Sequence, residues 1–91
     1  MYVEWDPEKE KRNIHKHGVS FEEAREVFAD PLHIAVLDER FSYFEERWIV
    51  IGRTIVAAVL WDFDAQEEEV VRIISAREAT RHEREQYEEH E

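Results

Sequence analysis

The stretch TIVAAVLW, residues 54–61, decides the fold. Seven of its eight positions are apolar, with Thr54 as the exception. An extended segment of this kind has no polar side to present to solvent, so it predicts a central strand that is covered on both faces. The rest of the chain must therefore supply neighbouring strands and covering helices.

Other segments on either side of this stretch are also typical of strands. They are rich in β-branched and aromatic residues, and polar turns separate them. These predicted strands are YVEW (2–5), HIAVL (33–37), RWIVI (47–51) and EVVRIIS (69–75). We expect them to form a small antiparallel sheet around residues 54–61.

The first predicted helix has a start signal and a stop signal. Asp6 can cap its N-terminus, and Pro7 suits the first helical position. The helix then runs through EKEKRNIHKH, residues 8–17, and ends at Gly18, which readily takes the left-handed conformation after a helix.

Two more helices are predicted from capping signals. Ser20 with Glu23 three residues later forms a capping box for FEEAREVFAD, residues 21–30. The last helix should start near Ala79, where Thr80 and Glu83 offer a second capping box, and its only large apolar side chain is Tyr87. The element order is then β-α-α-β-β-β-β-α, an α+β fold with two N-terminal helices and one C-terminal helix.

Length and composition limit the class of protein. Ninety-one residues suit one modest core, so we expect a single domain over residues 1–91. There is no cysteine and no apolar run of membrane-spanning length, so a cytoplasmic protein without a membrane contact is expected. The net charge of −11 argues against general affinity for nucleic acids, but it does not exclude a small basic site.

Arginines gather near the C-terminus of this acidic chain. Four of its twelve basic residues are Arg72, Arg77, Arg81 and Arg84. They could balance the surrounding glutamates, or they could bind an anion such as phosphate, which the planar guanidinium suits. Arg77 and Arg81 would be like charges one turn apart if both were helical, and this spacing favours a ligand between them.

A few other residues are candidates for chemistry. Histidine titrates near neutrality, so His17, next to Lys16, could move a proton, or it could only interact with the C-terminal end of its helix. Glu46 and Arg47 open a predicted strand, and Arg53 follows Gly52 in a predicted turn. No local pattern decides whether these three side chains point into a cleft or into water.

Metal binding has little support in the sequence. No two histidines have the i, i+4 spacing of a zinc-binding helix, and no glycine-rich phosphate loop is present. We therefore expect neither a metal nor another cofactor. RNA cleavage by its own 2′-hydroxyl needs neither, since a base, an acid and cations suffice.

Three motifs lie in order along nearly the whole chain. They are WDPEKEKRNIHKHGVSFEEAREVFADP (5–31), EERWIVIGRT (45–54) and RIISAREATRHEREQY (72–87). In these motifs the sequence resembles the BrnT family, the ribonuclease toxins of BrnT/BrnA type II toxin–antitoxin pairs. The resemblance implies a RelE-like fold and a metal-independent endoribonuclease that arrests growth by cutting RNA. It also implies a BrnA-like ribbon-helix-helix antitoxin that neutralises the toxin. Operator DNA would be bound only by the complex of toxin and antitoxin.

The resemblance also implies which residues matter. Catalytic roles are expected for His17, Glu46, Arg53, Arg77 and Arg81, and RNA contacts for Lys16, Arg47, Arg84 and Tyr87. In this hypothesis Arg53, Arg77 and Arg81 hold the scissile phosphate, and His17 or Glu46 moves the proton. The alternative hypothesis is a catalytically weak homologue that acts mainly as an antitoxin-binding co-repressor, which the acidic composition favours.

Overall fold

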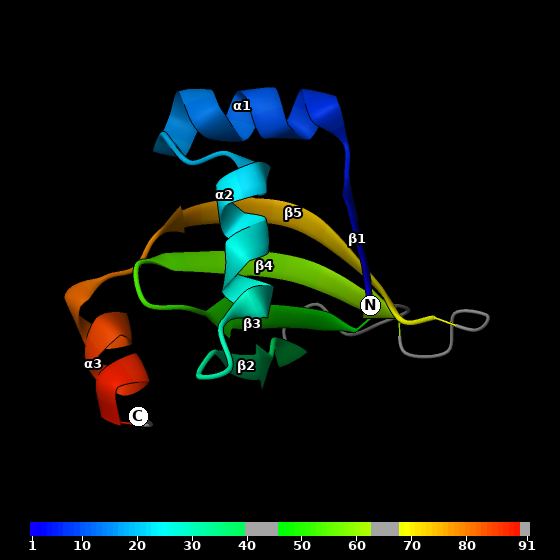
Figure 1. Cartoon of the computed structure of the whole chain (residues 1–91). Helices are drawn as coiled ribbons and strands as arrows, with labels where there is room; N and C mark the ends of the chain where they lie inside the picture. Colours follow the sequence, from blue (N-terminus) through cyan, green and yellow to red (C-terminus); the bar gives the residue numbers. More distant parts are fainter. Residues whose placement is uncertain (40–45, 63–67, 90–91) are drawn as a thin grey trace.

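The computed structural model describes residues 1–39, 46–62 and 68–89. The apolar stretch forms β4 (Ile55–Asp62), the middle strand of a five-stranded sheet with the order β1-β5-β4-β3-β2 (Figure 1). Its neighbours are β5 (Val70–Glu78) and β3 (Arg47–Ile51), and the edges are β1 (Tyr2–Trp5) and β2 (Ile34–Leu37). The predicted central strand and the α+β class are therefore confirmed.

The sheet is mixed, which corrects the expectation of an antiparallel one. Strands β2 to β5 pair antiparallel with their neighbours in turn. Strand β1 pairs parallel with β5, with Tyr2 opposite Val70 and Trp5 opposite Ile73. A four-residue strand carries no local signal for the direction of its partner, so the alternation in YVEW could not reveal this pairing.

Helices cover both faces of the sheet. Helix α1 (Pro7–His17), helix α2 (Phe21–Arg25) and the 3-10 helix η1 (Glu26–Ala29) lie on one side, and α3 (Arg81–Glu89) lies beside the β3–β4 turn (Figure 1). Adjacent residues of a strand point to opposite faces. Accordingly Ala57 belongs to the core that contains Phe21, whereas Val56 belongs to the one that contains Tyr87.

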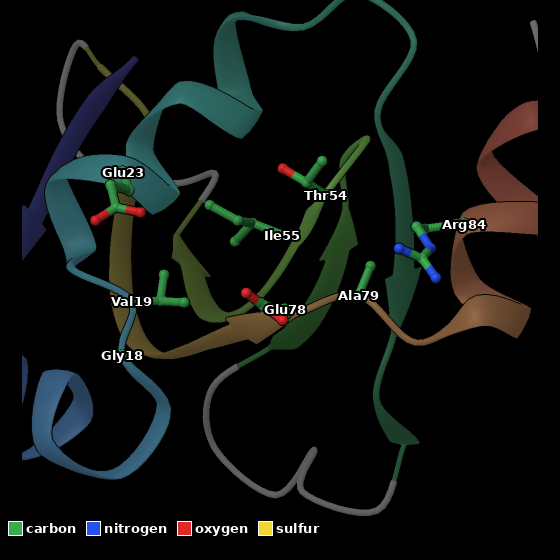
Figure 2. Close-up of a pocket in the computed structure, with 8 residues that line it drawn as sticks. All are labelled: Gly18, Val19, Glu23, Thr54, Ile55, Glu78, Ala79 and Arg84. Atoms are coloured by element: carbon green, nitrogen blue, oxygen red, sulfur yellow. The ribbon is translucent and has the colours of Figure 1, made fainter.

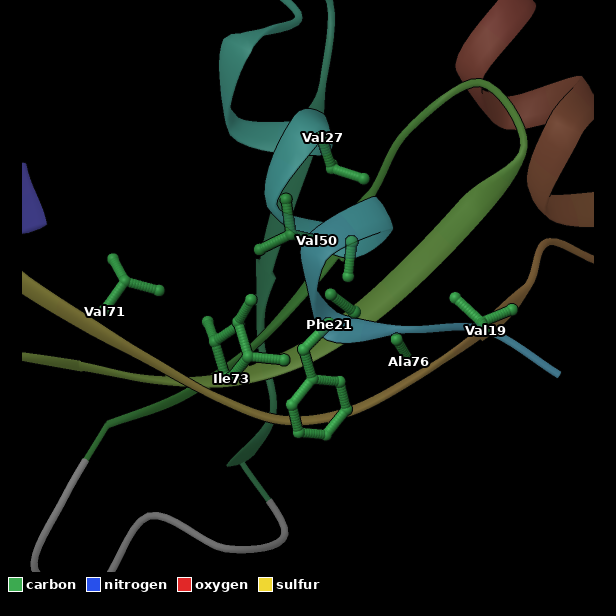
Figure 3. Packing of buried hydrophobic residues seen from close by; sticks show 10 residues of the cluster. Val19, Phe21, Val27, Val50, Val71, Ile73 and Ala76 are labelled. Atoms are coloured by element: carbon green, nitrogen blue, oxygen red, sulfur yellow. The ribbon is translucent and has the colours of Figure 1, made fainter. Parts of the chain in front are cut away.

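The larger core lies between the sheet and the N-terminal helices. Phe21 is fully buried there, in one cluster with Val50 and Ile73 (Figure 3). The smaller core consists of Ile51, Val56, Ala79 and Tyr87. Tyr87, which was expected to contact RNA, is thus the buried side chain of α3.

The predicted caps are present. The Asp6 carboxylate accepts a hydrogen bond from the Glu8 N–H at 2.9 Å, and Gly18 ends α1 with φ 71°. The Ser20 hydroxyl accepts from the Glu23 N–H at 3.0 Å. At the start of α3, the Thr80 hydroxyl accepts from the Glu83 N–H, while the Glu83 carboxylate accepts from the Thr80 N–H at 2.9 Å.

Three element boundaries differ from the prediction. The second helix is α-helical only to Arg25 and continues as η1, and α3 begins at Arg81 rather than near Ala79. Strand β5 extends to Glu78, with Arg77 paired to Val56. Arg77 is therefore a strand residue, and the predicted helical stack of Arg77 above Arg81 does not exist.

Asn13 closes the edge of β5 where β1 ends. Its amide donates to the carbonyls of Val19 and Ala76, both at 2.8 Å, and accepts from the Ala76 N–H at 3.1 Å. Strand β1 pairs with β5 only as far as Ile73. Beyond that residue, the bonds from Asn13 take the place of the hydrogen bonds that a neighbouring strand would form with β5. Asn13 is only 7% exposed, so it fixes α1 against β5.

The acidic segment DAQEEE (64–69) lies mostly outside the described residues. Its last residue, Glu69, accepts a hydrogen bond from the Trp61 indole N–H at 3.1 Å. None of the helices in the described part of the chain has the length and apolar character needed to cross a membrane.

Candidate functional site

Arg77 is neutralised by a carboxylate of α3. Its Nη1 and Nη2 donate to Oε1 and Oε2 of Glu83 at 2.7 and 2.8 Å. The hydrogen bond from Arg77 is the main cause that lowers the pKa of Glu83 to about 2, and the same bond raises the pKa of Arg77. In this structure Arg77 therefore binds Glu83, while 43% of its side chain remains exposed.

Two other arginines of the C-terminal motif also meet acids. Arg81 Nε lies 3.3 Å from Glu85 Oε1 on the outside of α3, and Arg81 is 88% exposed. Arg72 lies 3.4 Å from Glu4 across β5 and β1. For three of the four arginines, the alternative of charge balance within the chain describes the structure.

Tyr87 has a buried position. It is 4% exposed, and its hydroxyl donates to Asp30 at 2.5 Å. This hydrogen bond is the main cause that lowers the pKa of Asp30. The Tyr87 ring could stack on an RNA base only if α3 moved, so here it anchors the helix.

Arg53 lies in the β3–β4 turn, at the same end of the sheet as Arg77. It lines a small hollow with Glu23, Glu26 and Asp30, and its charge adds to the lowering of the Asp30 pKa, which is mainly due to Tyr87. This hollow is on the α2 side of the sheet, whereas Arg77 points to α3. The two arginines therefore differ in their contacts, because Arg53 lines this hollow and the Arg77 guanidinium binds Glu83.

Gly52 explains the tight approach beside Arg53. A Cβ atom built on Gly52 would lie 3.1 Å from both methyl groups of Val27 and 3.3 Å from the Ile55 carbonyl oxygen. A side chain at this position would require Val27 to shift by a few tenths of an ångström. The glycine thus keeps Arg53 next to the N-terminal helices.

Glu46 and Arg47 lie at the opposite end of the β3–β4 hairpin. The Glu46 carbonyl accepts from the Trp61 N–H at 3.0 Å, and Arg47 Nε lies 3.9 Å from Asp38. At 3.3 Å per residue, Glu46 and Arg53 are roughly 20 Å apart along the chain. Glu46 is therefore not near the other predicted catalytic residues.

Cations gather instead in a hollow between α1 and β5, which we name the α1 hollow. Its volume is about 290 Å³, and it is lined by Lys9, Arg12, Asn13, Lys16, His17, Ile74 and Ser75. Lys9, Arg12 and Lys16 follow one another at spacings of three and four residues, so they share one face of α1. The sequence already contained this spacing, but only Lys16 and His17 of this group were predicted as site residues.

The cations of the α1 hollow differ from the C-terminal arginines in their surroundings. Within residues 1–39, 46–62 and 68–89, the side chains of Lys9, Arg12, Lys16 and His17 form no ion pair or hydrogen bond. The neighbouring Lys11, which does not line the hollow, has Glu8 at 3.6 Å. Positive charge without an ion pair among the described residues therefore gathers on this face of α1, while on α3 it is present at Arg84.

A second hollow lies at the end of the sheet, and we name it the sheet-end hollow (Figure 2). Val19, Ile55 and Ala79 are its apolar residues, and its volume is about 280 Å³. Its polar residues come from four elements or turns and are Glu23, Thr54, Glu78 and Arg84. Only Arg84 was expected from the sequence, because the meeting of the other three depends on tertiary structure.

The two hollows are neighbours along the chain. His17 lines the α1 hollow and Gly18 lines the sheet-end hollow. On β5, likewise, Ser75 lines the α1 hollow and Glu78 lines the sheet-end hollow. Consecutive residues at the end of α1 and nearby residues of β5 thus line the two hollows.

Comparison with known protein families found a match over most of the chain. A family model described as the ribonuclease toxin, BrnT, of type II toxin–antitoxin systems matches residues 5–83. Comparison with curated proteins gave no match. The matched region includes both α1 and β5, and it covers most of the 91 residues. The chain therefore belongs to the BrnT family of ribonuclease toxins of type II toxin–antitoxin systems.

Proposed function

We propose that the chain is an endoribonuclease that cuts RNA without a metal ion, and that the scissile phosphate binds in the α1 hollow. The observation that carries this proposal is the group of cations on α1 without acidic partners among the described residues. The family supports ribonuclease activity in general. The position of the phosphate rests on the charge and shape of the hollow.

The chemistry needs few groups. The 2′-hydroxyl of RNA loses its proton, its oxygen bonds to phosphorus, and the bond from phosphorus to the 5′-oxygen breaks as that oxygen takes up a proton. Arg12 and Lys16 would stabilise the charge that develops on the phosphate. His17 is the group in the hollow suited to moving a proton near neutral pH.

His17 is a better candidate for this proton transfer than Glu46. Glu46 lies at the far end of the hairpin, where its carboxylate accepts from the Trp48 indole N–H at 3.3 Å. The nearest cation along the chain, Arg47, already has Asp38 beside it. We propose that Glu46 and Arg47 contact RNA outside the cleavage site.

The other predicted arginines would then act around the site. Arg84 lines the sheet-end hollow, and its side chain has no partner in the part of the chain that the structure describes. Arg53 would follow on the other side of Thr54. Arg77 and Arg81 would contribute only after leaving Glu83 and Glu85.

Further properties follow from the family as proposals. A type II toxin has an antitoxin partner, and we propose that it is a BrnA-like ribbon-helix-helix protein whose complex with the toxin binds operator DNA. We also propose a RelE-like fold and a cytoplasmic location. The net charge of −11 suits a partner with a basic contact surface.

A second candidate is a catalytically weak homologue that serves as a co-repressor. The pairing of Arg77 with Glu83 and of Arg81 with Glu85 favours it, because it removes two expected phosphate ligands. Cleavage by purified protein distinguishes the two candidates. A co-repressor would bind the antitoxin and leave RNA intact.

The test is cleavage of RNA by the purified chain, freed of antitoxin, in the presence of EDTA. We expect cuts that leave 2′,3′-cyclic phosphate ends. His17→Ala should slow cleavage by roughly 100-fold or more. His15→Ala is the matched control, since His15 is exposed on the same helix but does not line the hollow.

Three outcomes contradict the proposal. Folded wild-type protein that leaves RNA intact would support the co-repressor instead. Loss of cleavage in EDTA would refute metal independence. Equal cleavage rates of the His17→Ala and His15→Ala variants would show that cleavage does not take place in the α1 hollow.

A further inference from the structure

We propose that the sheet-end hollow binds the RNA base next to the scissile phosphate and selects guanine through Glu78 and Arg84. This inference rests on the proposed function, because it takes the phosphate to lie in the neighbouring α1 hollow. It goes further by naming the base and the residues that recognise it. Neither the family nor the predicted site residues assign a role to Glu78.

The position of the hollow suits a neighbouring nucleotide. It begins at Gly18, directly after His17, and it continues along β5 to Glu78 and Ala79. A phosphate near His17 therefore leaves an adjoining base within reach of the sheet-end hollow. The Gly18 backbone does not obstruct this path, since a Cβ atom there would have no neighbour within 4 Å.

The chemistry of the lining suits a base. Figure 2 shows Val19, Ile55 and Ala79 lining the same hollow as the side chains of Glu78 and Arg84. Apolar side chains can cover the face of a base, while polar groups at the border bond its edges. The volume of about 280 Å³ admits one base rather than a folded RNA segment.

Glu78 is the carboxylate available for recognition. The other carboxylate in the hollow, Glu23, accepts from the Ser20 hydroxyl at 3.3 Å in the cap of α2. The Glu78 side chain has no hydrogen bond or ion pair among the residues that the structure describes, and Glu78 is exposed. An ionised carboxylate only accepts hydrogen bonds, so its ligand must donate them.

Guanine fits this requirement better than the other bases. It presents N1–H and N2–H side by side and can donate both to one carboxylate. Its O6 and N7 accept from arginine, which is a common specific contact to guanine. Glu78 and Arg84 could thus take two edges of the same base.

The other bases meet repulsion at the same place. Adenine and cytosine each present a ring nitrogen that accepts hydrogen bonds where guanine has N1–H. Uracil has one N–H between two carbonyl oxygens, which would face the Glu78 carboxylate. The selection therefore combines attraction for guanine with repulsion of its competitors.

The first experiment sequences the cuts that the protein makes in a random RNA library. Wild-type protein should cut next to guanine, and Glu78→Gln should lower that preference about tenfold, the value of one two-bond contact to a base. Glu88→Gln is the matched control, because it removes the same charge from an exposed position on α3 outside the hollow. Circular dichroism establishes that each variant is folded.

A second experiment measures binding without cleavage, with 3′-GMP and 3′-AMP as probes. We expect tighter binding of 3′-GMP, with the difference reduced in Glu78→Gln and in Arg84→Met. If the wild-type protein binds 3′-GMP in this way but does not cut RNA, the proposed function fails and the inference stands. If active protein shows no preference for guanine, or if Glu78→Gln keeps the full preference, the inference is wrong.

Discussion

The Arg77 guanidinium and the Glu83 carboxylate face each other through two hydrogen bonds, of 2.7 and 2.8 Å. This pair joins the end of β5 to the first turn of α3. Near the other end of α3, the Tyr87 hydroxyl is bonded to Asp30. Since Tyr87 is the buried residue of α3, these two contacts hold a mostly polar helix on the sheet.

The Arg77–Glu83 pair should contribute more to stability than the exposed pair on the same helix. A double-mutant cycle with Arg77→Ala and Glu83→Ala should give a coupling free energy of about 1 kcal/mol, since the bonds are paired and Glu83 is 16% exposed. The same cycle for Arg81 and Glu85 should give about 0.3 kcal/mol, because Arg81 is 88% exposed. Urea unfolding measures both, and equal couplings would contradict this reading of the structure.

The same pair predicts how stability changes with pH. The pKa of Glu83 is lowered from 4.5 to about 2 by the hydrogen bond from Arg77. A carboxyl whose pKa is lower in the folded state stabilises that state above its unfolded pKa, and this stabilisation is lost as the pH falls through the folded pKa. The difference in unfolding free energy between wild type and Glu83→Gln should therefore be full above pH 4.5 and shrink between pH 4.5 and 2. A constant difference across this range would show that the charge of Glu83 is not involved.

Tyr87 should control whether α3 stays on the sheet. Tyr87→Ala should lower the unfolding free energy by about 3 kcal/mol, because a buried aromatic side chain is removed. Tyr87→Phe should cost about 1 kcal/mol through loss of the hydrogen bond to Asp30. Hydrogen exchange should become faster in residues 81–89 of the alanine variant and stay slow in β4. Tyr2→Ala is the control, since Tyr2 is 54% exposed, and a similar cost there would contradict the prediction.

The α1 hollow predicts the salt dependence of RNA binding. For single-stranded RNA, the slope of log affinity against log salt is about −0.7 for each neutralised phosphate, so three α1 cations predict about −2. Arg12→Ala should reduce the slope by about 0.7, and Lys11→Ala should leave it unchanged. The contrast follows from position, since Lys11 lies beside Glu8 and outside the hollow. An equal effect of both variants would show that RNA only senses the overall charge.

Local signals in the sequence predicted the helix ends well. Asp6, Gly18 and the Thr80–Glu83 capping box act within a few residues, so their geometry depends little on the rest of the fold. The apolar run of β4 also sufficed to predict a central strand. These features are encoded where they occur.

Arg77 shows where local reasoning ended. The stretch around it contains good helix formers, but its pairing with Val56 and the bond from the Ala79 N–H to the Thr54 carbonyl hold it extended. The extended conformation is therefore set by strand partners about twenty positions away in the sequence, and a local sequence pattern does not include them. The parallel pairing of Tyr2 with Val70 has the same origin.

The residues of the candidate site also fall into two groups, those that local sequence spacing predicts and those that only the tertiary structure brings together. Lys9 and Arg12 could have been added to Lys16 from helical spacing alone, because the three share one face of α1. The meeting of Glu78 with Arg84 could not, since it depends on how β5 turns into α3. Likewise, only the fold separates Glu46 from the rest.

The most direct test of the central claim is an NMR titration with a short RNA that carries 2′-deoxyribose at the cleavage position. Such an RNA binds but cannot be cut, because its nucleophile is missing. The α1 hollow predicts the largest shifts at Lys9, Arg12, Lys16, His17 and Ser75, with smaller ones at Arg77 and Arg81. Shifts confined to α3 and the β3–β4 turn, with α1 unchanged, would contradict the account.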